Sequence, residues 1–200
     1  SGTGGYEFVI EPGTETSMKV TATLFQRKKV KKLGTAPLTS MFFYGENVNI
    51  RPADDYRPEV HDYDGLLISS DTGEWIWRPL IDPKRLLVTS FGLKNPRGFG
   101  LFQRDRNFDH YQDLESHYEK RPSAWVIPEK GWGKGRVELV EIPTNNDRND
   151  NIVAYWVPGS LPASFSYQVK WGPLDSRLPP LGRVAATRTS AGGEKGVKLY

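Results

Sequence analysis

The chain has 200 residues, of which 37% are hydrophobic, and this is enough apolar material for one domain with a core. The formal net charge is only +3, without the dense basic clusters of nucleic-acid-binding proteins, so no nucleic-acid partner is expected. The absence of cysteine excludes disulfides and thiolate metal sites, and no apolar run is long enough to span a membrane.

The composition predicts a β-dominated fold, because 20 Gly and 15 Pro interrupt short segments that are rich in aromatic and β-branched residues. Apolar and polar side chains alternate in 18–24 and 164–171, as they do in half-buried strands. In chain order, strands are predicted at 6–10, 18–24, 40–44, 66–69, 74–78, 85–91, 99–103, 123–127, 137–142, 152–156 and 164–171.

Three other segments are expected to differ from strands. Residues 45–64 form a long polar stretch, and loops of that length in compact domains are usually functional or disordered. A single helix is predicted over Asn107–Glu119, where aromatic residues recur at helical spacing. Residues 172–200 are rich in Pro, Gly, Ser and Arg, which is typical of a linker.

The chain is organised around residues 136–156, in which two strand-like runs flank a very polar loop. Both runs are rich in residues that suit a pleated, half-buried surface. Asp150 stands at the mouth of the second run, where rigid β-structure would hold its carboxylate and a ligand could still reach it. The alternative interpretation is a solvated turn between two strands.

Aromatic rings and polar side chains in or beside the loops indicate a glycan site, because rings stack on sugar faces while Asp, Asn and Arg bind hydroxyl groups. Taken singly, each Trp is more commonly a core residue, except Trp132 in its Gly-rich loop. We predict that Trp132 and at least one of Trp75, Trp77 and Trp125 line the cleft. The predicted substrate-binding residues are Tyr56, Arg57, His61, Trp75, Trp77, Arg78, Trp125, Trp132, Asn149 and Asn151.

No metal ion and no cofactor are predicted. The three His residues, His61, His110 and His117, lack the spacing of a metal-ligand set, and the last two are expected at the surface. Residues 62–65 loosely resemble a calcium loop but lack its third acidic position and its closing Glu. The sequence contains neither a Gly-rich phosphate loop nor GxSxG.

Two carboxylates could hydrolyse a glycosidic bond, a reaction that needs an acid to protonate the leaving oxygen and a base to activate water. Asp62 and Asp150 lie in separate loops, each just before a predicted strand, so the fold could bring them together. Composition alone leaves this pairing open. In an inverting enzyme the two carboxyl groups lie about 6.5–9.5 Å apart, with room for a water molecule.

Several long and unusual strings together cover nearly the whole chain. They are APLTSMFFYG at 36–45, YRPEVHDYDGL at 56–66, GEWIWRPL at 73–80, NPRGFGL at 95–101, RPSAWV at 121–126, WGKG at 132–135, VELVEIPT at 137–144 and NDNIVAYW at 149–156. These strings resemble the bacterial periplasmic glucan biosynthesis proteins G and D (MdoG/OpgG and OpgD). ADDYRP, YQDLE and YQVKWG are slightly more similar to the D-type protein.

The resemblance implies an all-β fold, a galactose-mutarotase-like β-sandwich that is present here in part. Family members are much longer and carry a large N-terminal sandwich and a small immunoglobulin-like C-terminal domain. Residues 1–171 are then expected to belong to the glucan-binding and catalytic sandwich, as the second half of that domain. Residues 172–200 would be a linker toward the immunoglobulin-like domain.

The resemblance also implies a role in making osmoregulated periplasmic glucans, which are β-1,2-linked, and a location in the periplasm. Members are identified as inverting β-1,2-glucanases, with the general acid in the NDNIVA string, here Asp150, and the general base in the RPE-x-HD string, here Asp62. The acid must hold its proton near neutral pH, and Asp147 and Glu141 are close enough in sequence to supply a negative charge that raises its pKa.

The alternative from another class is a non-catalytic glucan-binding or scaffold protein that assists glucan assembly. A homodimer, or association with the glucan synthase complex, is a further expectation. An isomerase like the true mutarotases is disfavoured, because those enzymes use His with a carboxylate.

Overall fold

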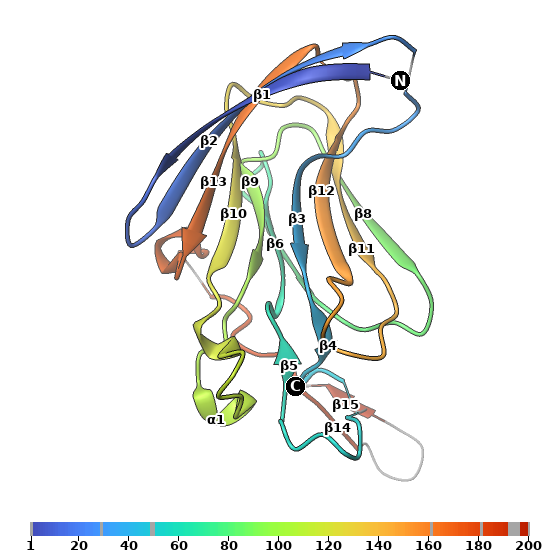
Figure 1. Ribbon diagram of the computed structural model, residues 1–200, viewed down its shortest axis with the longest axis vertical. Coiled ribbons are helices and arrows are strands. Elements are labelled where there is room, and N and C mark those ends of the chain that lie inside the picture. The colour runs from blue at the N-terminus through green and yellow to red at the C-terminus, as the bar shows by residue number, and fades with distance from the viewer. Residues whose placement is uncertain are drawn as a thin grey trace.

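The computed structural model describes residues 2–28, 30–48, 51–160, 162–180, 182–191 and 197–199 and confirms the β-dominated fold. Two antiparallel sheets face each other as the layers of a partial sandwich (Figure 1). In spatial order, the seven-stranded sheet contains β1 (Gly2–Glu11), β2 (Thr16–Gln26), β13 (Ser164–Gly172), β10 (Ser123–Pro128), β9 (Gly98–Phe102), β6 (Gly65–Ser69) and β7 (Trp75–Pro79). The four-stranded sheet contains β3 (Thr35–Ser40), β12 (Ile152–Pro158), β11 (Gly135–Glu141) and β8 (Leu87–Leu93).

Short elements gather around one end of the sandwich, the lower end in Figure 1. They include two small two-stranded sheets and an α-helix of four residues. No helix among the described residues is long and apolar enough to cross a bilayer. The short elements of the chain are β4 (Phe42–Tyr44), β5 (Val60–His61), α1 (Phe108–Tyr111), the 3-10 turns η1 (Tyr118–Lys120) and η2 (Asp175–Arg177), β14 (Thr189–Ala191) and β15 (Val197–Leu199).

The main core lies between the two sheets and follows from the alternation of side chains along each strand. On β6, Leu66 and Ile68 enter this core, whereas Leu67 between them points to the opposite face of the sheet. From the other layer, Leu139 and Trp156 are fully buried in the same cluster. Burying these side chains is the main favourable contribution to the sandwich, at about 1.5–3 kcal/mol for a fully buried Leu or Ile.

A second apolar cluster covers the outer face of the seven-stranded sheet. Trp75 and Trp77 lie on this face of β7 and pack with Trp125 of β10, whose ring stacks on Trp75 at a centroid distance of 5.9 Å. Leu174, just beyond β13, is fully buried against the same cluster. The start of the segment expected to be a linker therefore packs onto the sheet.

The predicted helix at Asn107–Glu119 is wrong in its extent. Helix α1 ends at Tyr111 because Gln112 adopts a left-handed conformation, with φ of 53°, and its N–H closes the turn on Phe108. The carboxylate of Asp113 then accepts the backbone N–H groups of Glu115 and Ser116, at 2.9 and 2.7 Å. Such a local side-chain bond competes with helical pairing, and hydrophobic spacing alone does not reveal it.

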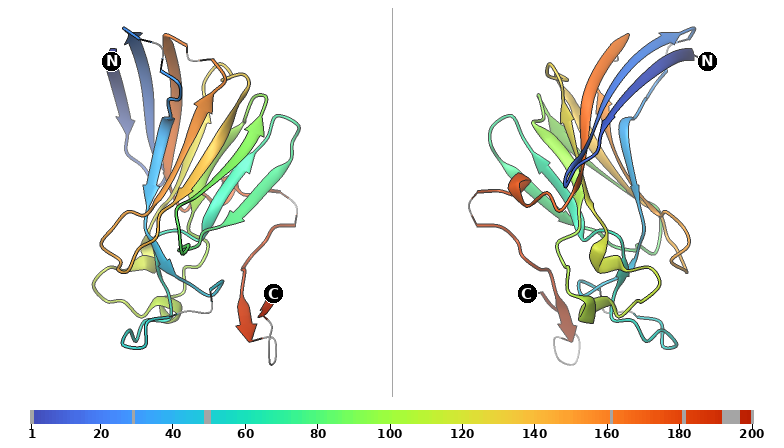
Figure 2. Two further views of the ribbon diagram at one scale, coloured as in Figure 1. Left: turned by 90° about the vertical axis from the view of Figure 1, so that its right-hand side faces the viewer. Right: turned by 60° about the vertical axis from the view of Figure 1, so that its left-hand side comes forward.

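The β1–β2 ribbon forms one edge of the seven-stranded sheet, and its outer strand is exposed. All ten residues of β1 are exposed, including the large apolar side chains of Phe8 and Ile10. The ribbon joins the seven-stranded sheet through β2, which pairs with β13 from Thr16 beside Trp171 to Thr23 beside Ser164. Figure 2 shows it at the edge of the sandwich, where β1 has a neighbouring strand on one side only.

Candidate active site

The two predicted catalytic carboxylates come from backbone segments that share a neighbour. The backbone N–H of Asp62, which follows β5, donates to the carbonyl of Met41 at 2.9 Å. Next along the chain, the N–H of Phe42 donates to the side-chain oxygen of Asn151 at 2.8 Å. Because Met41 and Phe42 are consecutive, these bonds bring Asp62 close to the start of β12, where Asp150 immediately precedes Asn151.

The electrostatics of Asp62 agree with this placement. Its side chain is largely buried, and burial raises the pKa of its carboxyl group. Arg121 lowers that pKa, with its Nε 3.2 Å from Asp62 Oδ1, while the negative charge of Asp150 raises it further. The pKa of Tyr63 rises to about 12 through burial, then through the charge of Asp62, and Asp150 adds to the effect. The two carboxylates are therefore close enough to interact electrostatically.

Asp150 itself is exposed at the end of the 142–151 loop. The two acids expected to supply negative charge to it are both engaged with arginines. Glu141 is fully buried and accepts the backbone N–H of Ile81 at 2.9 Å and the guanidinium of Arg78 at 3.3 Å. Asp147 is held by Arg57. Glu141 and Asp147 therefore each have an arginine partner, and Asp147 shares Arg57 with two other carboxylates.

Arg57 and Arg78 were predicted to bind substrate, and the structure shows both engaged with carboxylates of the protein. The guanidinium of Arg57 contacts Asp55 at 2.7 Å and both Asp113 and Asp147 at 2.9 Å. Its hydrogen bond holds the pKa of Asp55 at about 2, well below the usual value. Arg57 therefore joins three loops, one of which leads directly to Asp150.

We expect Arg57→Met to loosen the 142–151 loop, because the carboxylates of Asp113 and Asp147 lose their shared cation. The melting temperature should fall by several degrees, and proteases should cleave this loop faster. Arg148→Met, in the same loop, is the matched control, because among the described residues the exposed Arg148 side chain makes no ion pair. Equal effects of the two substitutions would contradict the role assigned to Arg57.

His61 and Asn151 are buried rather than directed at solvent. The ring of His61 stacks on Phe42 at 5.1 Å and meets the edge of Tyr111 at 5.2 Å. The amide of Asn151 accepts from Phe42 N–H and donates to the carbonyls of Phe42 and Ile142 at 2.9 and 3.0 Å. Both residues therefore fix the backbone beneath the two carboxylates.

Tyr56 and Asn149 are the predicted binding residues that remain available at this end. Tyr56 is 69% exposed, and Asn149 is exposed beside Asp150. Tyr56 borders an open cavity of about 540 Å³ between the long polar loop, the segment after α1 and the 142–151 loop. The ring of Tyr56 and the amides of Asn145 and Asn146 provide the stacking and hydrogen-bonding groups that a sugar chain needs.

The four tryptophans that were predicted to bind substrate do not gather around the two carboxylates. Trp132 lies before β11, whereas Asp150 follows its far end, and a strand of seven residues is roughly 20 Å long. Trp132 borders a separate cavity of about 590 Å³ with Trp156 and Phe165. Trp75, Trp77 and Trp125 lie on the outer face of the other sheet, where Trp125 is only 4% exposed.

Trp132→Ala is expected to act mainly on stability. The ring packs against Trp156 and Tyr167, at centroid distances of 5.9 and 5.8 Å, and donates its N–H to Ser166. Its loss should lower the free energy of unfolding by about 2–4 kcal/mol in urea denaturation. Trp132→Phe, which keeps a ring, should recover much of this loss. A variant of unchanged stability but weakened glucan binding would instead support the cleft position predicted from the sequence.

Sequence reasoning missed Arg121 and Tyr63 as neighbours of Asp62. Arg121 follows η1, and no spacing in the sequence connects it with Asp62. Tyr63 was recognisable only as the next residue along the chain. The sequence gives no indication of a role for its phenol, because an aromatic residue before a strand is most simply interpreted as a core residue.

Comparison with known proteins gives a consistent result. The profile of the family described as "Periplasmic glucan biosynthesis protein, MdoG" matches residues 1–199. The chain is 56% identical over 197 residues to "Glucans biosynthesis protein G" of Ralstonia nicotianae. This match covers 95% of the chain but 38% of the relative, so the chain spans well under half of the relative's length.

Proposed function

The chain belongs to the MdoG family of periplasmic glucan biosynthesis proteins, and from this premise we propose that it processes β-1,2-glucan in the periplasm as an inverting glycoside hydrolase. In this proposal Asp150 protonates the leaving glycosidic oxygen, and Asp62 removes a proton from the attacking water. The observation that supports it is that Asp62 bonds to Met41 while the next residue, Phe42, bonds to Asn151 beside Asp150, and that the charge of Asp150 raises the pKa of Asp62.

The surroundings of Asp62 suit a general base. Burial and the charge of Asp150 raise its pKa, which increases its affinity for the proton of a water molecule. Arg121 opposes this shift and favours the ionised carboxylate, the form that a base requires. Arg121 thus acts as a positioning and tuning residue for Asp62.

The surroundings of Asp150 suit contact with a large substrate. Its side chain is exposed, and the Asn151 amide beside it anchors the backbone through three hydrogen bonds. A glucan that covers Asp150 would exclude water, and desolvation then favours the protonated form that a general acid needs. In this proposal, binding of the substrate therefore provides the water-free surroundings that Asp150 needs to act as the general acid.

A non-catalytic glucan-binding role is the second candidate. The ion pair between Asp62 and Arg121 favours it, because a carboxylate that is committed to an arginine is a weaker base. The Tyr56 cavity would serve such a binding protein equally well. Association with a glucan-synthesising complex, or with a second copy, would fit this role.

The two candidates are separated by incubating the protein with linear β-1,2-glucan and measuring new reducing ends. Proton NMR of the first products should show the inverted, α-configured anomer if the proposal holds. Calorimetric titration with the same glucan is run in parallel, together with the full-length Ralstonia relative. Binding without new reducing ends would select the binding role, and retention of configuration would exclude an inverting mechanism.

A further inference from the structure

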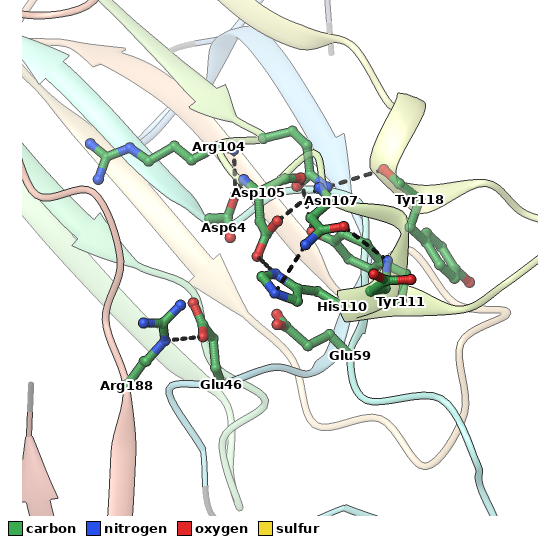
Figure 3. Close-up of polar contacts among 12 residues, drawn as sticks. Glu46, Glu59, Asp64, Arg104, Asp105, Asn107, His110, Tyr111, Tyr118 and Arg188 are labelled. Atoms are coloured by element: carbon green, nitrogen blue, oxygen red, sulfur yellow. Dashed lines mark hydrogen bonds and ion pairs between the residues drawn. The ribbon is translucent and has the colours of Figure 1, made fainter.

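A second group of ionisable side chains lies near the same end of the sandwich and takes no part in the proposed hydrolysis. Glu59 precedes β5, Asp105 follows β9, and His110 lies on α1. One ligand atom from each lies within 4.8 Å of the other two. Figure 3 shows the carboxylates of Glu59 and Asp105 on either side of the His110 ring.

Among the described residues, the two carboxylates of this group have no Lys or Arg partner, the kind that usually neutralises a buried acid. Glu59 is only 5% exposed, and a buried carboxylate is costly unless a positive charge accompanies it. Within the described part of the chain, neither Glu59 nor Asp105 forms an ion pair with Lys or Arg, and their only ion-pair partners are histidines.

The two arginines that border the site are directed to other groups. Arg188 pairs with Glu46 (Figure 3). The guanidinium of Arg104 lies over the Trp77 ring, 3.2 Å from its centroid. Arg104 also donates to the carbonyl of Val184. Among the described residues, histidines are therefore the only basic side chains that pair with these two carboxylates, and a metal ion would add positive charge to the group.

The surrounding groups hold the ligands in place. His61 Nε2 contacts Glu59 Oε2 at 2.9 Å, and the His61 ring is buried, with no hydrogen-bond partner for Nδ1 among the described residues. Asp105 Oδ2 lies 2.5 Å from His110 Nδ1, and Asp105 Oδ1 accepts the backbone N–H of Asn107 at 3.0 Å. Supporting contacts of this kind orient ligands around metal ions in proteins.

A cavity of about 370 Å³ lies beside the three side chains and is bordered by His61 and Asp64 as well. It has room for the water molecules that complete a coordination sphere. Ligand atoms around one Zn²⁺ lie about 3.4 Å apart, given bonds of about 2.0–2.2 Å in a tetrahedron. The ligand atoms lie within 4.8 Å of one another, so this geometry requires the wider separations to close and the 2.5 Å contact between His110 Nδ1 and Asp105 Oδ2 to open.

We propose that Glu59, Asp105 and His110 bind a divalent transition-metal ion, with Zn²⁺ as the best-fitting probe. The imidazole selects against Ca²⁺ and Mg²⁺, which prefer oxygen ligands, and the two carboxylates complete a three-ligand set with an open position. Sequence spacing gave no sign of this site, because its ligands come from three separate segments. The bound ion would connect α1 to the segment that leads into Asp62.

The test uses tag-free protein that has been treated with chelator and titrated with Zn²⁺ by calorimetry. One Zn²⁺ per chain should bind, with a rise in melting temperature, since an ion that binds only the folded state stabilises it. Glu59→Gln, Asp105→Asn and His110→Gln should each weaken binding at least 10-fold. Co²⁺ should give visible absorption bands of a nitrogen- and oxygen-ligated ion, and His110→Gln should alter them.

His117→Gln is the matched control. His117 and His110 have the same side-chain exposure of 39%, and each pairs with one carboxylate, but His117 pairs with Glu119 outside the group. If buried Glu59 cannot be replaced without unfolding, the half-buried His110 decides the outcome. Absence of stoichiometric Zn²⁺ binding, tighter binding of Ca²⁺ than of Zn²⁺, or equal losses in His110→Gln and His117→Gln would each overturn the assignment.

Discussion

Replacing Asp62 by Asn is expected to reduce β-1,2-glucan turnover by about 100- to 10,000-fold, the range that general acid–base groups contribute. The amide keeps the shape of the carboxylate but cannot take a proton from water. Asp150→Asn should cause a loss of similar size, because its amide cannot protonate the leaving oxygen. Glucan affinity should change little in either variant, and the two losses should not multiply, because both groups act in one step.

The leaving group separates the two roles. A substrate with a good leaving group needs little protonation, so it should partly rescue Asp150→Asn and not Asp62→Asn. Asp109→Asn is the control, because Asp109 is an exposed carboxylate on α1 that does not border the Tyr56 cavity. Full activity in both Asp62→Asn and Asp150→Asn would remove the hydrolase proposal and leave the glucan-binding one.

Asn151→Leu should lower the free energy of unfolding by about 3–6 kcal/mol, one of the largest single effects in this fold. The substitution leaves the buried N–H and C=O of Phe42 without their amide partner, and it also removes the part-buried bond to the carbonyl of Ile142. Each such unsatisfied group costs roughly 1–3 kcal/mol. Urea denaturation, with unfolding followed by tryptophan fluorescence, measures the change.

Asn149→Leu is the matched control for this substitution. Asn149 lies two positions away and is exposed. Its side chain forms only long hydrogen bonds, each of 3.4 Å, to Thr144 and Asn146. Its replacement should change stability by no more than about 0.5 kcal/mol. If Asn151→Leu were equally mild, the anchoring of the Asp150 backbone to β4 would have no energetic basis.

Strand β7 shows which features of this fold a sequence pattern can reveal and which it cannot. Alternation placed Trp75 and Trp77 on one face of a strand and Ile76 on the other, and Ile76 does pack against the central core. The pattern could not say what covers the tryptophan face, because Leu174 reaches it from a distant part of the chain. Periodicity is local, whereas burial depends on the topology.

The candidate site was predictable to a similar extent. Asp62 and Asp150 were placed before strands by pattern and paired by family resemblance. The partners of Arg57 could not be foreseen, since charge counts do not tell a substrate-binding arginine from one that joins three loops. The sequence likewise predicts a ligand-binding role for the Asn151 amide, because a polar residue within a polar segment gives no indication that its side chain is buried.

The pairing of β2 with β13 has a consequence for how this chain acquires its fold. Thr16 lies beside Trp171, and β3 pairs with β12. Strands β2 and β3 therefore pair with strands that come more than 100 residues later in the chain. Closing such long loops is entropically costly, and proteins rich in distant contacts fold slowly. During synthesis, which proceeds from the N-terminus, the β1–β2 hairpin must therefore remain undocked until β13 has left the ribosome.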